Sequence, residues 1–506
     1  MELAGSILSF LYDLVCALLV LYGMQRTVVL AAHLRERRRP HPEPPAPVAW
    51  PTVTVQLPVF NERYVVRRLL EAVSHLDYPR DRLEIQILDD STDCTARLLR
   101  RLTAVLRRRG IEVQHLHRCR RHGYKAGALA AGLRRARGEL VALFDADFVP
   151  PPDFLRRAVP HVLQPGVGAV QARWGHLNRD TSWFTRLQAV LLDGHFVIEQ
   201  PARSATGCFL SFNGTCGVWR RAAIAAAGGW SSATLTEDLD LSLRAQLHGW
   251  RILYLPDVVV PGELPEDPNS FRSQQRRWTR GGVQVARRML PRILRAPLPL
   301  HVKVEAFFHL TCYAAHPLLL LLALLRMPVR VLGQERTLMG LLPWEIELLC
   351  IGTLPLIAFY ALAAWGSGDV RRVWRCLALG LPAMALGAGL AISNTRAVLE
   401  GLCGRDLTFE RTPKPGGRPA AVRRPAAYRS PRAWIAVVEV MLLVYLLLWK
   451  VLGTGTRAVT DVPFLMFFGF GLLALALPSL GGGRLAAAPW WRMPANNARS
   501  CSATSA

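Results

Sequence analysis

Two aspartates at the end of an apolar run are the residues of this sequence that most directly suggest chemistry. The run "ELVALFDADF" (139–148) has the pattern of a buried β-strand and contains Asp145 and Asp147 near its end. In an extended segment, residues two positions apart project to the same side, so both carboxylates can face one ligand. Such a pair can hold Mg²⁺ or Mn²⁺, hard cations that also bind phosphate oxygens. A solvated acidic loop would contain the same residues, so the pair alone leaves both interpretations open.

A second acidic pair and a lysine stand in comparable positions. Asp89 and Asp90 follow the apolar stretch in "ILDDSTD" and can accept hydrogen bonds from a nucleobase or a ribose, or form a local Asx turn. Lys125, in "RHGYKAGAL", stands where a helical pattern begins. A lysine and free backbone N–H groups at a helix start can bind a diphosphate, although an ordinary surface lysine fits the same context.

A third acidic cluster lies at the start of a predicted helix. The stretch "LTEDLDLSLRAQLHGW" (235–250) predicts a helix with Thr236 as its N-cap and Gly249 beyond its end. Glu237 and Asp238 fall in the first turn, where the helix dipole favours negative charge, and helix stability alone explains them. The same dipole would also keep a carboxylate ionised and able to accept a proton from a hydroxyl group.

The segments that carry these residues alternate between strand and helix patterns. The alternation predicts an α/β domain with a mostly parallel sheet covered by helices on both faces. Ligands of such sheets bind at the carboxyl ends of the strands, where the first two acidic pairs lie. Strand patterns occupy residues 52–60, 83–90, 111–116 and 139–148, and helical patterns occupy residues 62–75, 95–110 and 125–136.

Apolar residues make up 51% of the 506-residue chain and are concentrated outside this domain. We therefore expect a multi-pass integral membrane protein, with the α/β domain inserted between α-helical transmembrane segments. The membrane is expected to be the plasma (inner) membrane. Six stretches have about the length that crosses a bilayer, namely 5–30, 302–326, 344–366, 373–393, 433–453 and 461–480.

The net charge is +25, and arginines cluster beside these stretches, at residues 35–40 and 394–432. The positive-inside rule assigns both segments, and the α/β domain, to the cytosol. Charge that borders membrane spans, without a binding motif, argues against nucleic acid as a partner. An odd number of crossings before segment 394–432 would put it outside, so we expect 373–393, which contains Arg375 and Pro382, not to cross.

Taken together, the motifs resemble those of a known family. Their order is Asp89–Asp90, "DAD" at 145–147, "TED" at 236–238 and QxxRW at 274–278. It is similar to the order in processive family 2 glycosyltransferases, which include cellulose, mannan, hyaluronan and curdlan synthases. The resemblance covers residues 50–415. The stretches "FNGTCGVWRR" and "TLTEDLDLSLRA" look closest to cellulose synthase-like group A, whose members make mannan and glucomannan. The resemblance implies a GT-A-like fold.

The resemblance implies a donor side built from the first motifs. Asp89 and Asp90 match aspartates that contact the nucleotide. Asp145 and Asp147 match the DxD pair, whose second aspartate ligands an Mg²⁺ or Mn²⁺ ion on the diphosphate of the sugar nucleotide. Lys125 would lie near the same diphosphate.

The resemblance also implies an acceptor side. Asp238 matches the general base that deprotonates the acceptor hydroxyl, and Glu237 precedes it in the same motif. Trp278 would stack on a sugar ring, Gln274 would bind its hydroxyls and Arg277 would meet the leaving diphosphate. The alternative is a tryptophan at a membrane interface flanked by snorkelling arginines. That interpretation is kept for an interfacial helix with Arg280, Arg287, Arg288, Arg292 and Arg295.

A final motif lies in the basic segment 394–432. "FERTPK" (409–414) resembles the FxVTxK gating loop of cellulose synthases, with Arg411 in place of valine. Thr412 and Lys414 would then reach over the bound nucleotide, and a flexible basic loop is the alternative. The resemblance thus implies seven parts: a transmembrane helix and linker (1–49), a glycosyltransferase domain (50–270), the QxxRW motif with an interfacial helix (271–300), a transmembrane region (301–393), the loop segment (394–432), two transmembrane helices (433–480) and a tail (481–506).

These roles imply an inverting glycosyltransferase that polymerises and translocates a β-linked polysaccharide from GDP-mannose or UDP-glucose. Its partners would be the nucleotide sugar, a growing polysaccharide or lipid acceptor, and membrane lipids. A non-processive enzyme that glycosylates a membrane lipid is the alternative, because such enzymes share QxxRW and several spans. A transporter without chemistry would need neither DxD nor TED, and a nucleotide sensor would not need Asp238.

Overall fold

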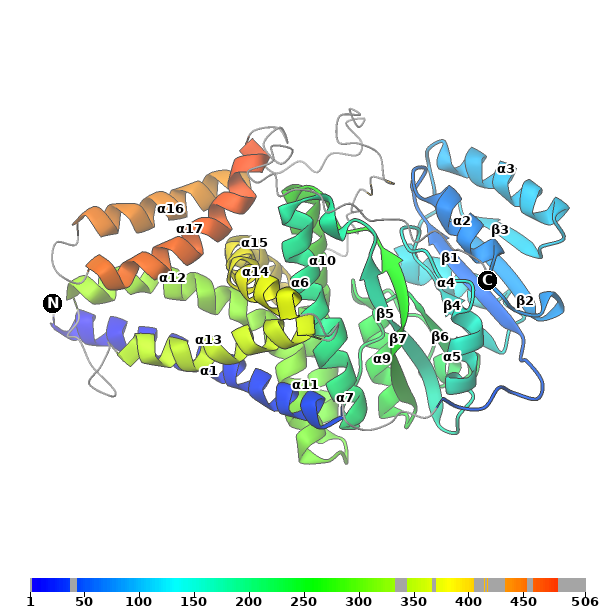
Figure 1. Ribbon diagram of the computed structural model, residues 1–506, viewed down its shortest axis with the longest axis horizontal. Coiled ribbons are helices and arrows are strands. Elements are labelled where there is room, and N and C mark those ends of the chain that lie inside the picture. Colours follow the sequence, from blue (N-terminus) through cyan, green and yellow to red (C-terminus); the bar gives the residue numbers. More distant parts are fainter. Residues whose placement is uncertain are drawn as a thin grey trace, which may run out of the picture.

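The computed structural model describes residues 2–36, 43–332, 344–365, 370–404, 414, 416, 433–452 and 458–480. Long apolar helices gather at one end of the molecule and a helix-covered sheet forms the other end (Figure 1). Helices α6 (Trp183–Asp193) and α10 (Pro268–Arg295) lie between these two parts. The α/β domain is thus joined to the membrane helices through packed helices as well as through the chain.

The sheet is mixed and mostly parallel, which confirms the predicted fold class. Its strand order is β3–β2–β1–β4–β6–β5–β7. Strand β6 runs antiparallel to β4 and β5, and the other paired strands run parallel. The first four strands match the strand patterns of the sequence within a few residues, and β5 to β7 were not predicted. The bounds are β1 Val53–Val59, β2 Leu83–Asp89, β3 Val113–His117, β4 Leu140–Leu143, β5 Val167–His176, β6 Gly217–Arg220 and β7 Arg251–Gly262.

Helices cover both faces of the sheet. Successive side chains of β1 point to opposite faces, and both sets are buried. Val55 and Leu57 are fully buried on one face, and each such side chain contributes roughly 1.5–3 kcal/mol by leaving water. Thr54, on the other face, is also buried and donates a hydrogen bond to Glu84 Oε2 at 2.7 Å. The first face packs against α2 (Val66–Ser74), α3 (Thr95–Arg108) and α5 (Phe154–Val162), and the second against α4 (Tyr124–Leu133), α8 (Arg221–Ala226) and α9 (Glu237–Leu247).

The apolar helices make this a multi-pass membrane protein. Among the described residues, three helical segments are long and apolar enough to cross a bilayer: Gly5–Glu36, Leu300–Arg326 and Val462–Leu480. The helices are α1 (Glu2–Glu36), α11 (Leu300–Thr311), α12 (Ala315–Leu332), α13 (Trp344–Trp365), α14 (Val370–Gly389), α15 (Ala391–Cys403), α16 (Ala433–Leu452) and α17 (Ala458–Leu480).

Helices α14 and α15 bear on the expected topology. They are bent by 50° at Leu390, as in a broken span or a re-entrant loop. The bend falls at the end of stretch 373–393, which we expected not to cross. A re-entrant loop would fit that expectation and a broken span would not, so the expectation stays a prediction.

The arginines of α10 require one correction. Arg280 was assigned to a snorkelling interfacial face, but its side chain is 7% exposed and its Nη1 lies 3.5 Å from Glu400 Oε2 on α15. Arg276 donates to both carboxylate oxygens of Glu400 at 2.7 Å. Arg287 donates to the carbonyl of Gly401 at 3.3 Å. This face of α10 therefore packs against α15, and the sequence pattern could not distinguish buried ion pairs from lipid headgroup contacts.

One buried ion pair ties α10 to the last two helices. Arg272 Nε donates to Glu439 Oε1 on α16 at 3.1 Å, and a second hydrogen bond joins Arg272 Nη2 to Glu439 Oε2. The two side chains are 4% and 0% exposed. Arg272 Nη1 also donates to Ser479 Oγ on α17 at 2.7 Å.

We expect Arg272→Met to lower the stability of the protein by about 3–5 kcal/mol, because it leaves the Glu439 carboxylate buried without its charged partner. The double substitution Arg272→Met with Glu439→Leu should recover most of the loss, since no unpaired charge remains. Thermal unfolding of the purified protein in detergent measures both. A double variant as unstable as the single one would contradict this account.

Candidate functional site

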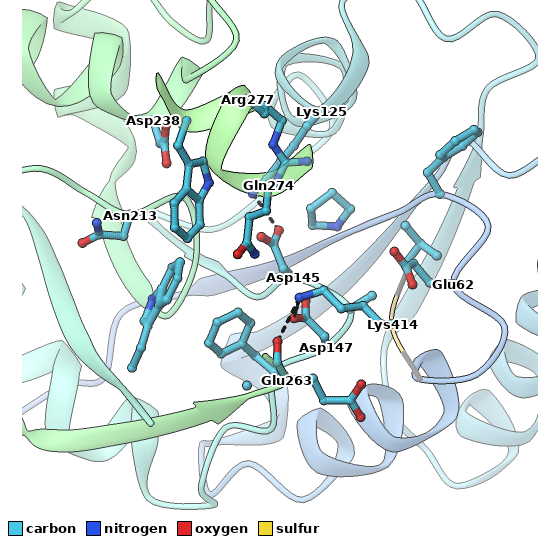
Figure 2. A pocket seen from close by; sticks show the side chains of 18 of the residues that line it. Glu62, Lys125, Asp145, Asp147, Asn213, Asp238, Glu263, Gln274, Arg277 and Lys414 are labelled. Atoms are coloured by element: carbon cyan, nitrogen blue, oxygen red, sulfur yellow. Dashed lines mark hydrogen bonds and ion pairs between the residues drawn. The ribbon is translucent and has the colours of Figure 1, made fainter. Parts of the chain in front are cut away.

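The predicted motifs converge on one cavity at the carboxyl ends of the strands (Figure 2). Its wall includes the loops after β1, β2 and β4 and the first turns of α4 and α9, and α10 closes one side. Thr412 lies outside the described residues. The cavity is lined by ten of the residues singled out from the sequence: Asp90, Lys125, Asp145, Asp147, Glu237, Asp238, Gln274, Arg277, Trp278 and Lys414.

Lys125 lies at the centre of the acidic groups. Its Nζ lies 2.6 Å from Asp145 Oδ1 and 4.0 Å from Glu237 Oε1, and it donates to the carbonyl of Gly214 at 2.9 Å. The helix that carries it starts after Gly123, whose φ of +69° suits glycine. Burial alone would lower the pKa of Lys125, but the surrounding carboxylates raise it above its ordinary value. The lysine is therefore a largely buried cation.

The carboxylates of α9 are held in an unusual environment. Burial raises the pKa of Glu237 to about 7, against the opposing effect of Lys125. Burial likewise raises the pKa of Asp238, while Lys125 and a hydrogen bond from the Leu239 N–H to Asp238 Oδ1 (2.9 Å) lower it. Thr236 is the N-cap residue as predicted, but its side chain makes no capping hydrogen bond. The two acids are thus stronger proton acceptors than exposed carboxylates.

Asp147 faces the segment that carries the last motif. Its Oδ2 lies 2.5 Å from Lys414 Nζ, which also donates to the carbonyl of Glu263 at 3.0 Å (Figure 2). Glu263 pairs in turn with Arg68 at 2.8 Å and accepts the N–H of Gly416 at 3.0 Å. Asp147, which is expected to hold a metal ion, therefore has the Lys414 ammonium beside it. Its surroundings are thus able to stabilise positive charge.

The neighbouring aspartates Asp89 and Asp90, at the end of β2, point in different directions. Asp90 lines the cavity and is held by Arg118, whose Nε and Nη2 donate to it at 2.7 and 2.6 Å. Asp89 has no exposed surface and accepts hydrogen bonds from the Ser91 N–H (2.8 Å) and from His115 (2.9 Å). Burial would raise the pKa of Asp89, but these hydrogen bonds keep it below its ordinary value. The predicted nucleotide contact thus fits Asp90, whereas Asp89 does not line the cavity.

Several lining residues were not found from the sequence. Arg121 lies 3.5 Å above the ring of Phe60, and Asp90 attracts it. Burial lowers the pKa of Arg121 to about 10. Trp174 lies 6.4 Å from Trp278, ring centre to ring centre, so two indoles line one side. The arginine-rich stretch before Lys125 and the second tryptophan were visible in the sequence, but the strand that carries Trp174 was not predicted. The others are Glu62, Asn213 and Glu263.

The class of protein follows from the fold, the site and one family comparison. Residues 51–281 match the family described as "Glycosyltransferase like family 2". The match over this segment confirms the resemblance seen in the motifs. A solved structure supports the fold: the mannosyltransferase PcManGT of Pyrobaculum calidifontis, in complex with GDP-Man and Mn²⁺, aligns with a TM-score of 0.53 and 24% identity over 77% of this chain and 100% of that one.

Two similar relatives carry a more specific name than the family. The chain is 47% identical over 251 residues to glucomannan 4-beta-mannosyltransferase 2 of Arabidopsis thaliana, covering 49% of this chain and 47% of that protein. It is 43% identical over 277 residues to glucomannan 4-beta-mannosyltransferase 1 of Cyamopsis tetragonoloba, covering 53% and 52%. The chain spans about half the length of these relatives in the match.

The raised pKa of Glu237 predicts that the stability of the protein depends on pH through this residue. A carboxyl group with an unfolded pKa of 4.5 and a folded pKa of about 7 destabilises the fold progressively as pH rises between these values. Glu237→Gln should therefore be more stable than the wild type at pH 8, by about 3 kcal/mol at most, and equally stable near pH 4. Thermal unfolding at both pH values measures the difference. The exposed Glu71→Gln on α2 is the control, and a pH-independent effect of Glu237→Gln would contradict the assignment.

Proposed function

We propose that this protein is an inverting β-mannosyltransferase that elongates a β-linked glycan with mannose from GDP-mannose. The observation that carries the proposal is the position of Asp238: it lines the same cavity as the acidic pair Asp145 and Asp147 and the tryptophans Trp174 and Trp278. A proton acceptor, a donor-binding end and an aromatic acceptor platform are thereby close together. The choice of mannose is supported by the names of the relatives.

The donor would bind at the acidic pair. Asp147, with Asp145 beside it, would hold an Mg²⁺ or Mn²⁺ ion, which would stabilise the charge that develops on the leaving diphosphate. Carboxylates outnumber basic groups among the described residues of the wall, which suits a divalent cation. Lys125 and Arg277 supply further positive charge to the phosphates. Asp90 and Arg121 lie in the same cavity and offer hydrogen-bond partners to the nucleoside.

The acceptor would bind on the other side. Trp278 and Trp174 offer flat apolar faces to a sugar ring, and Gln274 can hydrogen-bond to its hydroxyl groups. Asp238 removes the proton from the attacking hydroxyl, and the nearby Lys125 ammonium favours its ionised form. Attack opposite the diphosphate inverts the anomeric centre, so an α-linked donor gives a β-linked product without a covalent intermediate.

The membrane helices would receive the product. The domain would face the cytosol, where sugar nucleotides are present, and α10 joins its cavity to the apolar helices. We place the protein in the plasma membrane by analogy with the processive synthases it resembles. The alternative product, a glycolipid with one or two sugars, would use the same residues and differs only in whether the product stays bound.

The first test offers labelled GDP-mannose, and in parallel UDP-glucose, to the full chain in lipid nanodiscs with Mn²⁺. We expect a large, mannanase-sensitive product from GDP-mannose. Asp238→Asn should lower the rate about 10²–10⁴-fold, because the general base is lost. The exposed Asp257→Asn is the control. A chloroform-soluble product would establish the glycolipid alternative, and full activity of Asp238→Asn would refute the assigned base.

Gly214 provides a second test of the base. Its φ is +78°, and a β-carbon there would lie 2.7 Å from Asp238 Oδ2 and 3.2 Å from Lys125 Nζ. Gly207 also has a positive φ, of +66°, with nothing within 4 Å of its β-carbon position. Alanine at either position should lower stability by about 1 kcal/mol. Gly214→Ala alone should also lower the initial rate of transfer, by at least roughly tenfold, because it displaces the base. Equal rates in the two variants would contradict this geometry.

A further inference from the structure

A cluster of possible metal ligands lies outside the cavity, at the open edge of the sheet. Asp89 Oδ2 lies 2.9 Å from His115 Nε2 and 3.1 Å from His117 Nδ1, and the three atoms lie within 4.8 Å of one another. Asp89 ends β2, and the two histidines belong to the edge strand β3. The cluster takes no part in the proposed chemistry.

Strand geometry explains why the three side chains meet. His115 and His117 are two positions apart on β3 and therefore point to the same face, and Asp89 is the register partner of His117. In a tetrahedral site with bonds of about 2.0–2.1 Å, neighbouring ligand atoms lie about 3.3 Å apart, which is close to the two separations from Asp89 of 2.9 and 3.1 Å. The two histidine nitrogens lie within 4.8 Å of each other. The side chain of His117 is 39% exposed, which leaves an open side from which an ion and a water ligand can enter.

The ligand types indicate which ion would bind. Imidazole nitrogens favour zinc and its neighbours in the transition series, whereas Mg²⁺ and Mn²⁺ prefer oxygen ligands such as those of Asp145 and Asp147. Two histidines and one carboxylate, with water in the fourth position, form a common type of zinc site. We propose that Asp89, His115 and His117 bind one Zn²⁺ ion, separate from the metal of the transfer reaction.

The position of the cluster suggests what the ion does. Asp89 Oδ1 accepts the Ser91 N–H at 2.8 Å, and Ser91 Oγ accepts the Asn61 N–H at 3.0 Å. Asn61 lies between two residues that line the cavity, and Arg118, which holds Asp90, follows His117 directly. An ion on Asp89 and His117 therefore links the two loops that form one end of the cavity. Its role is to fix that wall.

The test uses the full chain in nanodiscs, stripped of metal with a chelator and titrated with Co²⁺ as a spectroscopic substitute for Zn²⁺. We expect one ion per chain with the visible absorption of a four-coordinate site, and one Zn²⁺ per chain by elemental analysis. His117→Gln should weaken binding at least tenfold. His122→Gln, an exposed histidine nearby, should bind like the wild type, and so should Asp147→Asn, which separates this site from the acidic pair.

Thermal unfolding shows whether a variant that does not bind the ion is still folded. Zn²⁺ should raise the unfolding temperature of the stripped wild type and leave that of His117→Gln unchanged, while both melt alike in chelator. His115→Gln gives the same test from a second ligand. The proposal fails if the wild type takes up no Co²⁺, if both histidine variants bind it unchanged, or if Asp147→Asn abolishes the four-coordinate signal. The last outcome would assign the ion to the transfer site and leave the proposed function standing.

Discussion

The arrangement of the site depends on one buried ammonium group, that of Lys125. It contacts Asp145 at 2.6 Å, lies 4.0 Å from Glu237 and donates to the carbonyl of Gly214. Burial raises the pKa of Glu237 and of Asp238, and the Lys125 ammonium opposes that rise, so both carboxylates would be harder to ionise without this cation. Lys125 therefore joins the donor side to the acceptor side, because one charge serves the acidic pair and the proposed base together.

Helix α10 carries this arrangement to the membrane helices, because different faces of it contact different partners. Trp278 lines the cavity, whereas Arg276 pairs with Glu400 of α15. Gly281 lets Thr236 approach so closely that a β-carbon there would lie 2.6 Å from the threonine methyl group. Since Thr236 precedes the acids of α9, a shift of α10 would move the aromatic platform and the proposed base at once. On the proposed function, the helix would couple the position of the acceptor to that of the base.

Sequence patterns predicted the parts of this structure that local periodicity encodes. The first four strands and the acidic pair after β4 follow from apolar runs and spacing. Strand β7 was missed because Pro256 and Pro261 interrupt its pattern, and with β5 the role of Trp174 was missed as well. Asp89 and Asp90 were given one role, yet adjacent residues at a strand end face opposite sides, so only Asp90 reaches the cavity. Tertiary contacts, not the motif, decide such cases.

The contact between Lys414 and Asp147 joins the last sequence motif to the carboxylate that is proposed to bind the metal of the donor. A divalent ion on Asp147 would stand close to the Lys414 ammonium, and two unit charges 4 Å apart repel by about 4 kcal/mol at an effective dielectric constant of about 20. The lysine and the ion therefore compete for this carboxylate. A metal-bound sugar nucleotide also brings two phosphates, whose negative charge offers the displaced ammonium a new partner. On the proposed function, loading of the donor would move Lys414 from Asp147 to the diphosphate, so this lysine would contact the nucleotide only when metal and donor are both present.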